Sequence, residues 1–461
     1  MPSTRRRTAA AAALAMLALP ACGGGGSDAD ADSITVWTTD TLPDRVAATK
    51  EIISAFTEET GIDVELVGVA EDQFIQTLTS EAAGGELPDV IGGMSLGVVR
   101  TLAANELLDT DANAAVVEAL GADTFSPEAL ALTSDGDAQL SVPSDIWSQL
   151  LIYRTDLFEQ AGLQPPETYD DILAAAEELD AGNVAGFVGP TSPGDTFTQQ
   201  TFEHVALANG CRLVDDAGEV VLDSSQCVGA FDFYGELVRN YSVPGVQDVD
   251  TTRAAYFAGR TAMIVWSTYI LDEMAGLRDD ALPSCPKCRQ DPAFLAENSG
   301  FVTSLQGPDG EAPAQFGEVV SWGIPTGSAT ESSQQFVEFL MSDGYEDWTA
   351  IAPEGKFPAR PGTEEDPQQY VDTWDTLPVG VDEKAPLADF YPPEVLEVLR
   401  TGPEDFERWG ITQGQGDLVG ALLGELPVPQ AVAALASGEV DAQTAAEDAA
   451  QDVRSIQESL Q

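Results

Sequence analysis

Short strand patterns alternate with amphipathic helix patterns along this chain, and that alternation limits the fold more than any other feature. In the N-terminal third the order is strand, helix, strand, helix, strand, at residues 34–37, 46–56, 62–67, 73–83 and 89–91. Apolar side chains recur with period two in the strand patterns and at helical spacing in the helix patterns. Repeated βα units predict a mainly parallel sheet covered by helices.

The same organisation continues through the middle of the chain and to its C-terminus. Thr168 followed by Asp171 resembles a capping box, and apolar residues then line one helical face up to Leu179. A last helix is predicted from about Asp441, with apolar residues at spacings of four and three up to Leu460. The 461 residues are enough for two α/β lobes, each with a core of its own.

The first 22 residues are typical of an export signal. Three arginines at 5–7 precede an apolar run from Ala9 to Leu19, which is too short to span a bilayer. The run ends in Leu-Pro-Ala-Cys-Gly, which resembles a bacterial lipobox, so we expect cleavage to leave Cys22 as a lipidated N-terminus. A chance cysteine after an ordinary signal is the alternative, and the paired arginines also permit twin-arginine export.

Residues 23–33 are rich in Gly and spaced Asp, a composition typical of a flexible tether. No later stretch is apolar for eighteen residues, so we expect contact with a membrane only through the lipid anchor. The predicted location is extracytoplasmic, either anchored to the outer face of the cell membrane or in a periplasm.

The chain carries 78 acidic and 20 basic residues, a formal net charge of −58. Such a charge repels nucleic acids and anionic lipid headgroups, so neither is expected as a partner. Because the acidic residues are spread along the whole chain, they indicate solubility in a saline environment more than a means of keeping acidic ligands away.

Four cysteines remain once Cys22 is assigned to lipid, and an even count in an exported chain favours two disulfides. The local pairing is Cys211–Cys227 and Cys285–Cys288, and two other pairings remain open. A four-thiolate zinc site or a redox pair at 285–288 is the weaker interpretation, because Pro283 and Pro286 place that segment in a loop. We therefore expect no metal site.

Six segments resemble, in the same order, the family of extracellular solute-binding proteins that serve sugar importers, the maltose-binding type. The most recognisable contains YRTDLFEQAGL at 153–163. The full set lies at residues 34–37 with 56–62, 87–90, 142–170, 257–266, 322–328 and 355–360. Two positions depart from the family pattern, since Arg154 replaces a common asparagine and Tyr169 a common tryptophan.

The resemblance implies an α/β, two-lobed periplasmic-binding-protein type II fold with a hinge and an interlobe cleft. We expect one lobe from 34–144 plus 318–365 and the other from 145–317 plus 366–461. It also implies a monomer without a cofactor that captures a small polar solute, most simply a sugar, and presents it to the permease subunits of an ABC importer by closing around it.

Sugars offer apolar ring faces to aromatic side chains and hydroxyls to carboxylates, amides and arginine. Residues of these kinds that fall at predicted strand ends or lobe crossings are the candidate ligand-binding residues: Trp37, Asp40, Asp145, Trp147, Trp266, Trp322 and Arg360. The alternative places the tryptophans in the core and the acids on the surface. Trp348 is expected in the core, and Trp374 and Trp409 are expected mostly outside the cleft.

Two other functions compete with solute delivery. An exported glycoside hydrolase would use a pair of carboxylates. In a chain with 78 acidic residues, such a pair cannot be recognised without its geometry. His204 is the only histidine, which leaves little scope for a Ser-His-Asp triad, and no Walker, G-x-S-x-G or H-E-x-x-H motif is present. A receptor that passes its ligand's signal to a partner is the second alternative. We expect a binding protein and not an enzyme.

Overall fold

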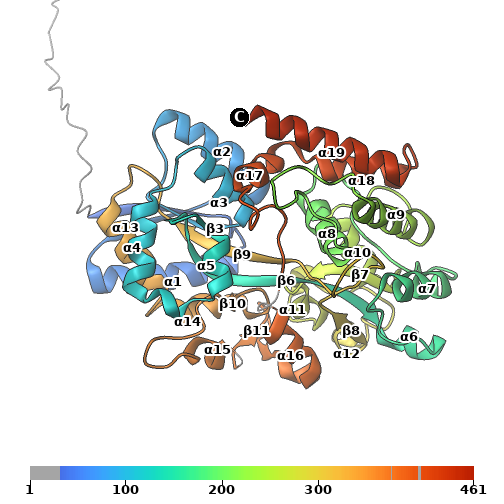
Figure 1. Cartoon of the computed structure of the whole chain (residues 1–461). Helices are drawn as coiled ribbons and strands as arrows, with labels where there is room; N and C mark the ends of the chain where they lie inside the picture. The colour runs from blue at the N-terminus through green and yellow to red at the C-terminus, as the bar shows by residue number, and fades with distance from the viewer. Residues whose placement is uncertain (1–31, 375, 403–405, 461) are drawn as a thin grey trace, which may run out of the picture.

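The computed structural model describes residues 32–374, 376–402 and 406–460 (Figure 1). The predicted signal sequence, Cys22 and nearly all of the predicted tether lie outside the described residues. The described chain is a mixed α/β structure in which a sheet of eight strands passes through both halves of an elongated molecule.

The first half of the molecule begins with the predicted βα units. Strand β1 (Ser33–Thr38) pairs in parallel with β2 (Asp63–Gly68) and β3 (Val90–Met94). Helices α1 (Pro43–Thr60), α2 (Glu71–Gly84) and α3 (Leu96–Ala104) connect and follow these strands. All five elements predicted for the N-terminal third are present, with small shifts at their ends.

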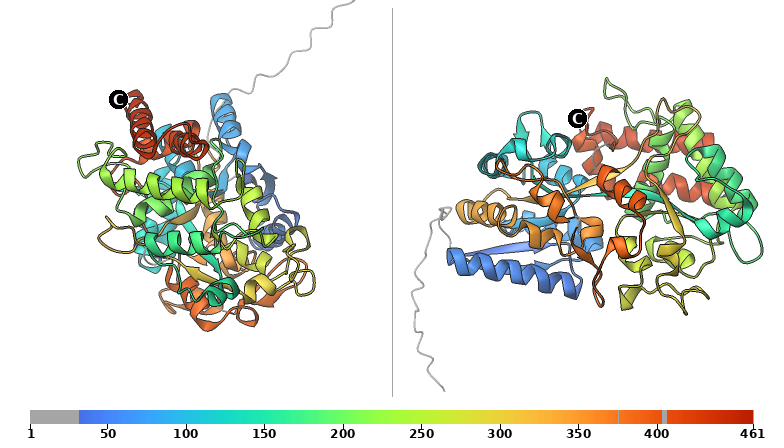
Figure 2. Two further views of the ribbon diagram at one scale, coloured as in Figure 1. Left: turned by 90° about the vertical axis from the view of Figure 1, so that its right-hand side faces the viewer. Right: turned by 90° about the horizontal axis from the view of Figure 1, so that it is seen from below.

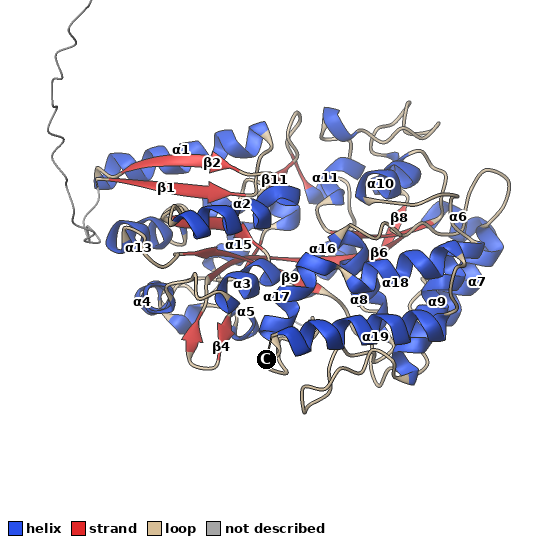
Figure 3. Ribbon diagram, turned by 90° about the horizontal axis from the view of Figure 1, so that it is seen from above, coloured by secondary structure: helices blue, strands red, loops and turns tan. Residues whose placement is uncertain are grey.

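Strand β6 (Val142–Arg154) passes from one half of the molecule to the other (Figure 3). Its N-terminal part pairs antiparallel with β9 (Gly317–Gly323) and β10 (Phe357–Pro358), and its C-terminal part pairs antiparallel with β7 (Met263–Ser267) and β8 (Ser299–Val302). One long strand therefore holds together the sheets of both lobes.

The prediction of a mainly parallel sheet was wrong. Of the strand pairs in the large sheet, only β1–β2 and β1–β3 are parallel, whereas β3–β9 and all pairs of β6 are antiparallel. The reason is the crossing itself: β6 leaves the first lobe and β9 returns to it, so the two neighbours run in opposite directions.

The second half of the molecule is mostly helical. Helix α7 (Tyr169–Leu179) begins with the predicted capping box of Thr168 and Asp171. Asp441 caps α19 (Ala442–Ser459), as the C-terminal pattern predicted. These two helices share one core with α8 (Thr196–Ala208), α9 (Ser225–Asn240) and α18 (Pro427–Ser437). Two further views show the C-terminal helices, in red, against this half (Figure 2).

The remaining elements are short or peripheral. In the first half they are α4 (Thr110–Leu120), η1 (Ala122–Thr124), α5 (Pro127–Leu132), β4 (Ser134–Asp135), β5 (Ala138–Gln139), α13 (Thr330–Leu340), α14 (Tyr345–Thr349) and η3 (Pro353–Gly355). In the second half and between the halves they are α6 (Thr155–Ala161), α10 (Val249–Phe257), α11 (Ile270–Met274), η2 (Asp279–Ala281), α12 (Phe294–Glu297), α15 (Gln369–Trp374), β11 (Pro378–Val379), β12 (Ala385–Pro386), η4 (Leu387–Asp389), α16 (Pro393–Thr401) and α17 (Gly416–Glu425).

The four cysteines of the folded body form two disulfides, Cys211–Cys227 and Cys285–Cys288. This is the local pairing favoured from the sequence, and all four cysteines are buried. Among the described residues, no single helix is long and apolar enough to cross a membrane. Helices α17 and α18 pass that test only together, with a bend of 50° between them, and most of their apolar side chains belong to the core that α7, α8 and α9 share.

Candidate functional site

A cavity of about 570 Å³ lies between the two lobes. Its first wall comes from Ile75 on α2 and from Ser95 and Val98 at the start of α3. Strand β3 ends at Met94, directly before Ser95, so the carboxyl end of a sheet strand opens toward the cavity. Ligands of α/β folds commonly bind at this end of the strands.

Helix α8 forms the polar wall on the opposite side. Asp195 caps its N-terminus, because its carboxylate accepts a hydrogen bond of 2.9 Å from the Phe197 backbone N–H. Side chains at spacings of three and four share one face of a helix. The face of α8 that lines the cavity carries four polar residues, Thr196, Gln199, Gln200 and Glu203.

Arg408 joins α8 to the crossing strand β9 in the cavity wall. Its Nη1 lies 2.8 Å from a carboxylate oxygen of Glu318 on β9, and its Nε lies 3.3 Å from Glu203. Glu318 also accepts the Leu96 backbone N–H at 2.8 Å, and Glu203 accepts that of Trp409 at 2.8 Å. Burial raises the pKa of Glu318, while the Arg408 charge acts in the opposite direction.

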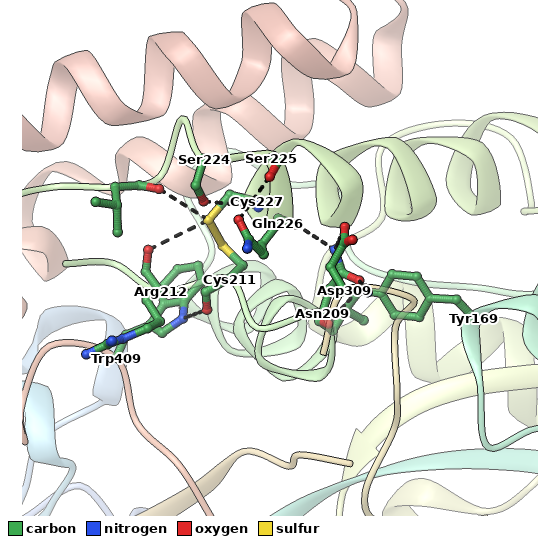
Figure 4. The surroundings of a disulfide bond; sticks show 12 residues. Tyr169, Asn209, Cys211, Arg212, Ser224, Ser225, Gln226, Cys227, Asp309 and Trp409 are labelled. Carbon is green, nitrogen blue, oxygen red and sulfur yellow. Dashed lines mark hydrogen bonds between the residues drawn. A yellow bond between two sulfur atoms is a disulfide. The ribbon is translucent and has the colours of Figure 1, made fainter. Parts of the chain in front are cut away.

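Trp409 is the one aromatic side chain among the described residues that line the cavity, and it is only 4% exposed. Its indole Nε1 donates a 2.9 Å hydrogen bond to the Cys211 carbonyl, and Cys211 is tied to Cys227 at the start of α9 (Figure 4). The disulfide therefore fixes the loop that orients the indole ring. Trp409 packs mostly in the core, as expected from the sequence, and the exposed part of its side chain lines the cavity.

Helix α17 closes the cavity with apolar side chains, namely Val419, Leu422, Leu423 and the adjoining Leu426. Although α17 (Gly416–Glu425) belongs to the segment 366–461 that was expected in the second lobe, it lies against α3 of the first lobe (Figure 1). A Cβ added to Gly420 would lie 2.6 Å from the Thr101 backbone nitrogen, and the Thr101 hydroxyl donates a 3.0 Å hydrogen bond to the Gly420 carbonyl. Glycine thus allows the two helix backbones to touch.

A second polar cluster contains two of the predicted ligand-binding residues. Asp40 and the fully buried Asp145 each have a carboxylate oxygen 3.9 Å from Lys356 Nζ. Lys356 also lies 3.9 Å from the centre of the Trp348 ring, and the Trp348 indole donates a 2.9 Å hydrogen bond to Asp145. Burial raises the pKa of Asp145, against the effect of Lys356.

This cluster continues into the second lobe. Arg45 on α1 lies 5.2 Å from the centre of the Tyr269 ring, which follows β7. Burial raises the pKa values of Asp272 and Glu354, and the charge of Arg45 opposes both shifts. The two lobes therefore meet over buried ionisable groups on this side.

None of the four predicted tryptophans lines the 570 Å³ cavity. Trp37 is half-buried against an apolar cluster of α2 and α3. The Trp147 ring packs 5.8 Å from that of Phe316, and the Trp266 ring packs 4.6 Å from that of Phe197. Strand ends place these side chains near the lobe crossing, but their rings pack into the surrounding cores.

Trp322 and Arg360 have structural positions inside the first lobe. Trp322 is fully buried and packs edge-on against Trp348 at 5.0 Å between ring centres. Arg360 donates hydrogen bonds of 2.7 Å to the carbonyls of Met341 and Leu120. Their placement as cleft residues is therefore corrected: both stabilise the first lobe, because the strand and loop that carry them lie inside its core.

Known proteins share this architecture. A family model described as Bacterial extracellular solute-binding protein matches residues 39–347. The putative ABC transporter periplasmic-binding protein YcjN of Escherichia coli K12 is 29% identical over 324 residues, which are 68% of this chain and 70% of that protein.

Solved structures show the same two-lobed fold. Maltose-bound MalE3 of T. maritima superposes with a TM-score of 0.70 at 19% identity, covering 92% of this chain and 99% of that one. A sugar transporter protein of Arthrobacter chlorophenolicus A6 with bound laminaribiose has a TM-score of 0.69 at 19% identity, with the same two coverages. A solute-binding protein of Thermotoga lettingae bound to α-D-tagatose has a TM-score of 0.71 at 20% identity.

Proposed function

This chain belongs to the bacterial extracellular solute-binding proteins, and we propose that it captures a sugar or oligosaccharide and delivers it to an ABC importer. The observation that carries the proposal is the interlobe cavity, which combines a row of polar side chains on α8 with the indole of Trp409. Hydroxyl and amide groups suit the rim of a sugar, and an aromatic face suits its ring. Pockets for small ligands are commonly apolar with a few convergent polar groups.

The relatives support a sugar as the solute. Maltose and laminaribiose occupy two of the structures that share this fold, and the relative from Escherichia coli carries the name of a transporter binding protein. In this proposal the chain binds its ligand without altering it and acts as a monomer whose partners are permease subunits.

We propose that binding draws together the two lobes, 34–144 with 318–365 and 145–317 with 366–461. The division is supported by the change of partners along β6, which pairs with β9 first and with β7 and β8 after it. Tyr370 packs with the apolar cluster of α1 and α13, and Trp374 packs with the cluster of β7 and α11, which supports a last crossing near residue 365. A hinge at these crossings would close the cavity around the ligand.

Ligand screening by thermal shift tests the sugar assignment. The mature protein should gain melting temperature with one class of mono- or oligosaccharide, because a ligand that binds only the folded state stabilises it. Gln199→Ala and Trp409→Ala should weaken that sugar's binding. Gln451→Ala, on the exposed face of α19, is the matched control and should leave the affinity unchanged.

Two results would contradict the proposal. If no sugar raises the melting temperature, the sugar assignment is wrong. If the protein hydrolyses a glycoside, it is an enzyme and not only a binding protein. Among the sequence-predicted ligand-binding residues, Trp37, Asp40, Asp145, Trp147 and Trp266 stay proposals. Closure would have to bring their side chains to the ligand, and the same binding assay on alanine variants tests this.

We also propose that the protein is exported and held at the membrane by lipid on Cys22. The lipobox-like sequence and the glycine-rich segment that follows it support this location. Several acyl chains on one residue would anchor the protein stably, at about 0.8 kcal/mol for each buried methylene. Cys22→Ser should move the protein from the membrane fraction to the soluble fraction, and retention of the variant in the membrane fraction would refute the anchor.

A further inference from the structure

The charges in the cavity wall are unevenly matched. Three carboxylates line the described cavity, those of Asp195, Glu203 and Glu318, and Arg408 is the one cationic side chain among its described lining residues. A cavity that receives an anion usually offers it a free guanidinium or ammonium group. The availability of Arg408 therefore decides which ligand charge this cavity accepts.

The Nε and Nη1 atoms of Arg408 both have partners within the protein. Both atoms face carboxylates, with Glu318 at 2.8 Å from Nη1 and Glu203 at 3.3 Å from Nε, and Nη1 also donates a 3.4 Å hydrogen bond to the Gly317 carbonyl. The guanidinium carbon lies 4.4 Å from the centre of the Phe316 ring. The side chain is thus held by two ion pairs and covered on one face by an aromatic ring.

The carboxylates are also fixed in place. Asp195 accepts the backbone N–H groups of Phe197 at 2.9 Å and of Val249 at 3.0 Å. Glu203 and Glu318 accept backbone N–H groups in addition to Arg408. None of the three can turn away from the cavity without losing a hydrogen bond, so the carboxyl groups are fixed features of the wall.

We propose that this cavity selects uncharged sugars and rejects their anionic counterparts, such as sugar phosphates and uronates. The inference rests on the proposed function and adds the charge class of the ligand. An anion that drew Arg408 away from Glu203 and Glu318 would leave two buried carboxylates without their counter-ion. If Arg408 stayed in place, the charge of the anion would face the carboxyl groups of Asp195, Glu203 and Glu318 in the same wall.

A matched series of ligands tests the selection. For each neutral sugar that binds, affinity is measured by calorimetry beside its 6-phosphate and its uronate, for example glucose, glucose 6-phosphate and glucuronate. We expect the anionic member to bind at least about a hundredfold more weakly. An anionic member that binds within about tenfold of the neutral one would overturn the charge selection and leave sugar capture standing.

A second experiment does not depend on which sugar binds. Inorganic phosphate is titrated into the wild type and into the Glu203→Gln, Glu318→Gln double variant, with chloride at matched ionic strength as reference. Glutamine keeps an oxygen that accepts the backbone N–H groups but frees the Arg408 charge. Millimolar phosphate should raise the melting temperature of the double variant and leave that of the wild type unchanged.

The control frees an arginine elsewhere. Asp223 and Arg454 form a half-exposed pair outside the cavity, at 2.7 Å, so Asp223→Asn should give no gain from phosphate. Stabilisation of the wild type by phosphate, or none of a folded double variant, would overturn the inference. If the double variant does not fold, the same phosphate titration is made on the Glu203→Gln single variant. The melting temperatures of this variant and of the wild type then test the inference. A protein that binds no sugar contradicts the proposed function, and the phosphate comparison still tests the charge selection.

Discussion

Trp348 donates its indole N–H to the carboxylate of Asp145 across 2.9 Å, and Asp145 is fully buried. The two residues come from β6 and α14, which are far apart in sequence. This bond links the strand that crosses between the lobes to the first-lobe core, next to Lys356. Burial raises the pKa of Asp145, and three groups at one of its carboxylate oxygens oppose that shift and favour the charged form: Lys356, the Ser144 hydroxyl and the Trp348 indole.

Trp348→Phe should lower the free energy of unfolding by about 1.5–3 kcal/mol, because it removes a hydrogen bond to a charged acceptor in a buried site. Trp374→Phe is the matched control, since the Trp374 indole donates to a neutral acceptor, the Pro353 carbonyl, at 2.8 Å. Trp374→Phe should therefore lower the free energy of unfolding by less, about 0.5–1.5 kcal/mol. Urea denaturation measures both, and equal losses would show that the charge of Asp145 adds nothing.

Stability should fall as the pH rises through the range in which Glu273 titrates. Burial raises its pKa to about 7 from an ordinary value of 4.5, with Arg253 opposing the shift and Asp272 adding to it. The folded state favours the protonated carboxyl, so the stabilisation is complete below 4.5 and is lost as the pH passes about 7. Glu273→Gln should reduce the pH dependence of unfolding over that range by on the order of 3 kcal/mol.

The control for this pH series is Glu439→Gln, at an exposed position between α18 and α19. Its unfolding free energy should follow that of the wild type at every pH. A Glu273→Gln profile parallel to the wild type from pH 4.5 to 7 would show that Glu273 keeps an ordinary pKa in the folded protein.

The two disulfides should differ in their contribution to stability. Cys211–Cys227 closes a loop of 16 residues and Cys285–Cys288 one of 3. By the chain-entropy relation, removing the first should lower the free energy of unfolding by about 3 kcal/mol and removing the second by about 2 kcal/mol. Paired Cys→Ala variants and guanidinium denaturation test the order. Because Cys211 holds the Trp409 indole, only the first pair should also weaken ligand binding.

Two glycines of α17 should respond in opposite ways to alanine. Gly420→Ala places a Cβ against the α3 backbone and should destabilise the protein by about 1–3 kcal/mol. A Cβ at Gly424 meets nothing within 4 Å, so Gly424→Ala should stabilise by about 0.5–1 kcal/mol through helix propensity. Urea denaturation of both variants decides whether α17 is held against α3 in solution, and a neutral Gly420→Ala would contradict that contact.

Much of the architecture was predictable from local patterns. The five elements of the N-terminal third, the capping box of Thr168 and Asp171 and the Asp441-capped final helix all depend on residues within a few positions of one another. The local pairing of Cys211 with Cys227 follows similarly from short separation and an even count. The polar face of α8 at 196, 199, 200 and 203 could have been found from helical spacing alone, had α8 been singled out.

The charge relationships of the candidate site were not predictable in this way. Glu318 and Arg408 are 90 positions apart, and nothing near either residue indicates that the other neutralises it. Trp322 follows a mostly apolar strand and Trp409 follows two charged residues, and neither local context indicates that the first lies inside the first-lobe core and the second against the cavity. The difference depends on which neighbours the crossing strands bring to each ring.

The sequence alone determined the alternation of strands and helices and the family resemblance. These are properties of short segments, whose backbone periodicity and side-chain chemistry act locally. Only the tertiary structure decided that the crossing strands run antiparallel, that α17 belongs against α3, and that Arg408 is shared between two carboxylates. The physical reason is that burial and electrostatic pairing depend on distances through space, which are set when the lobes pack together and not by the order of residues along the chain.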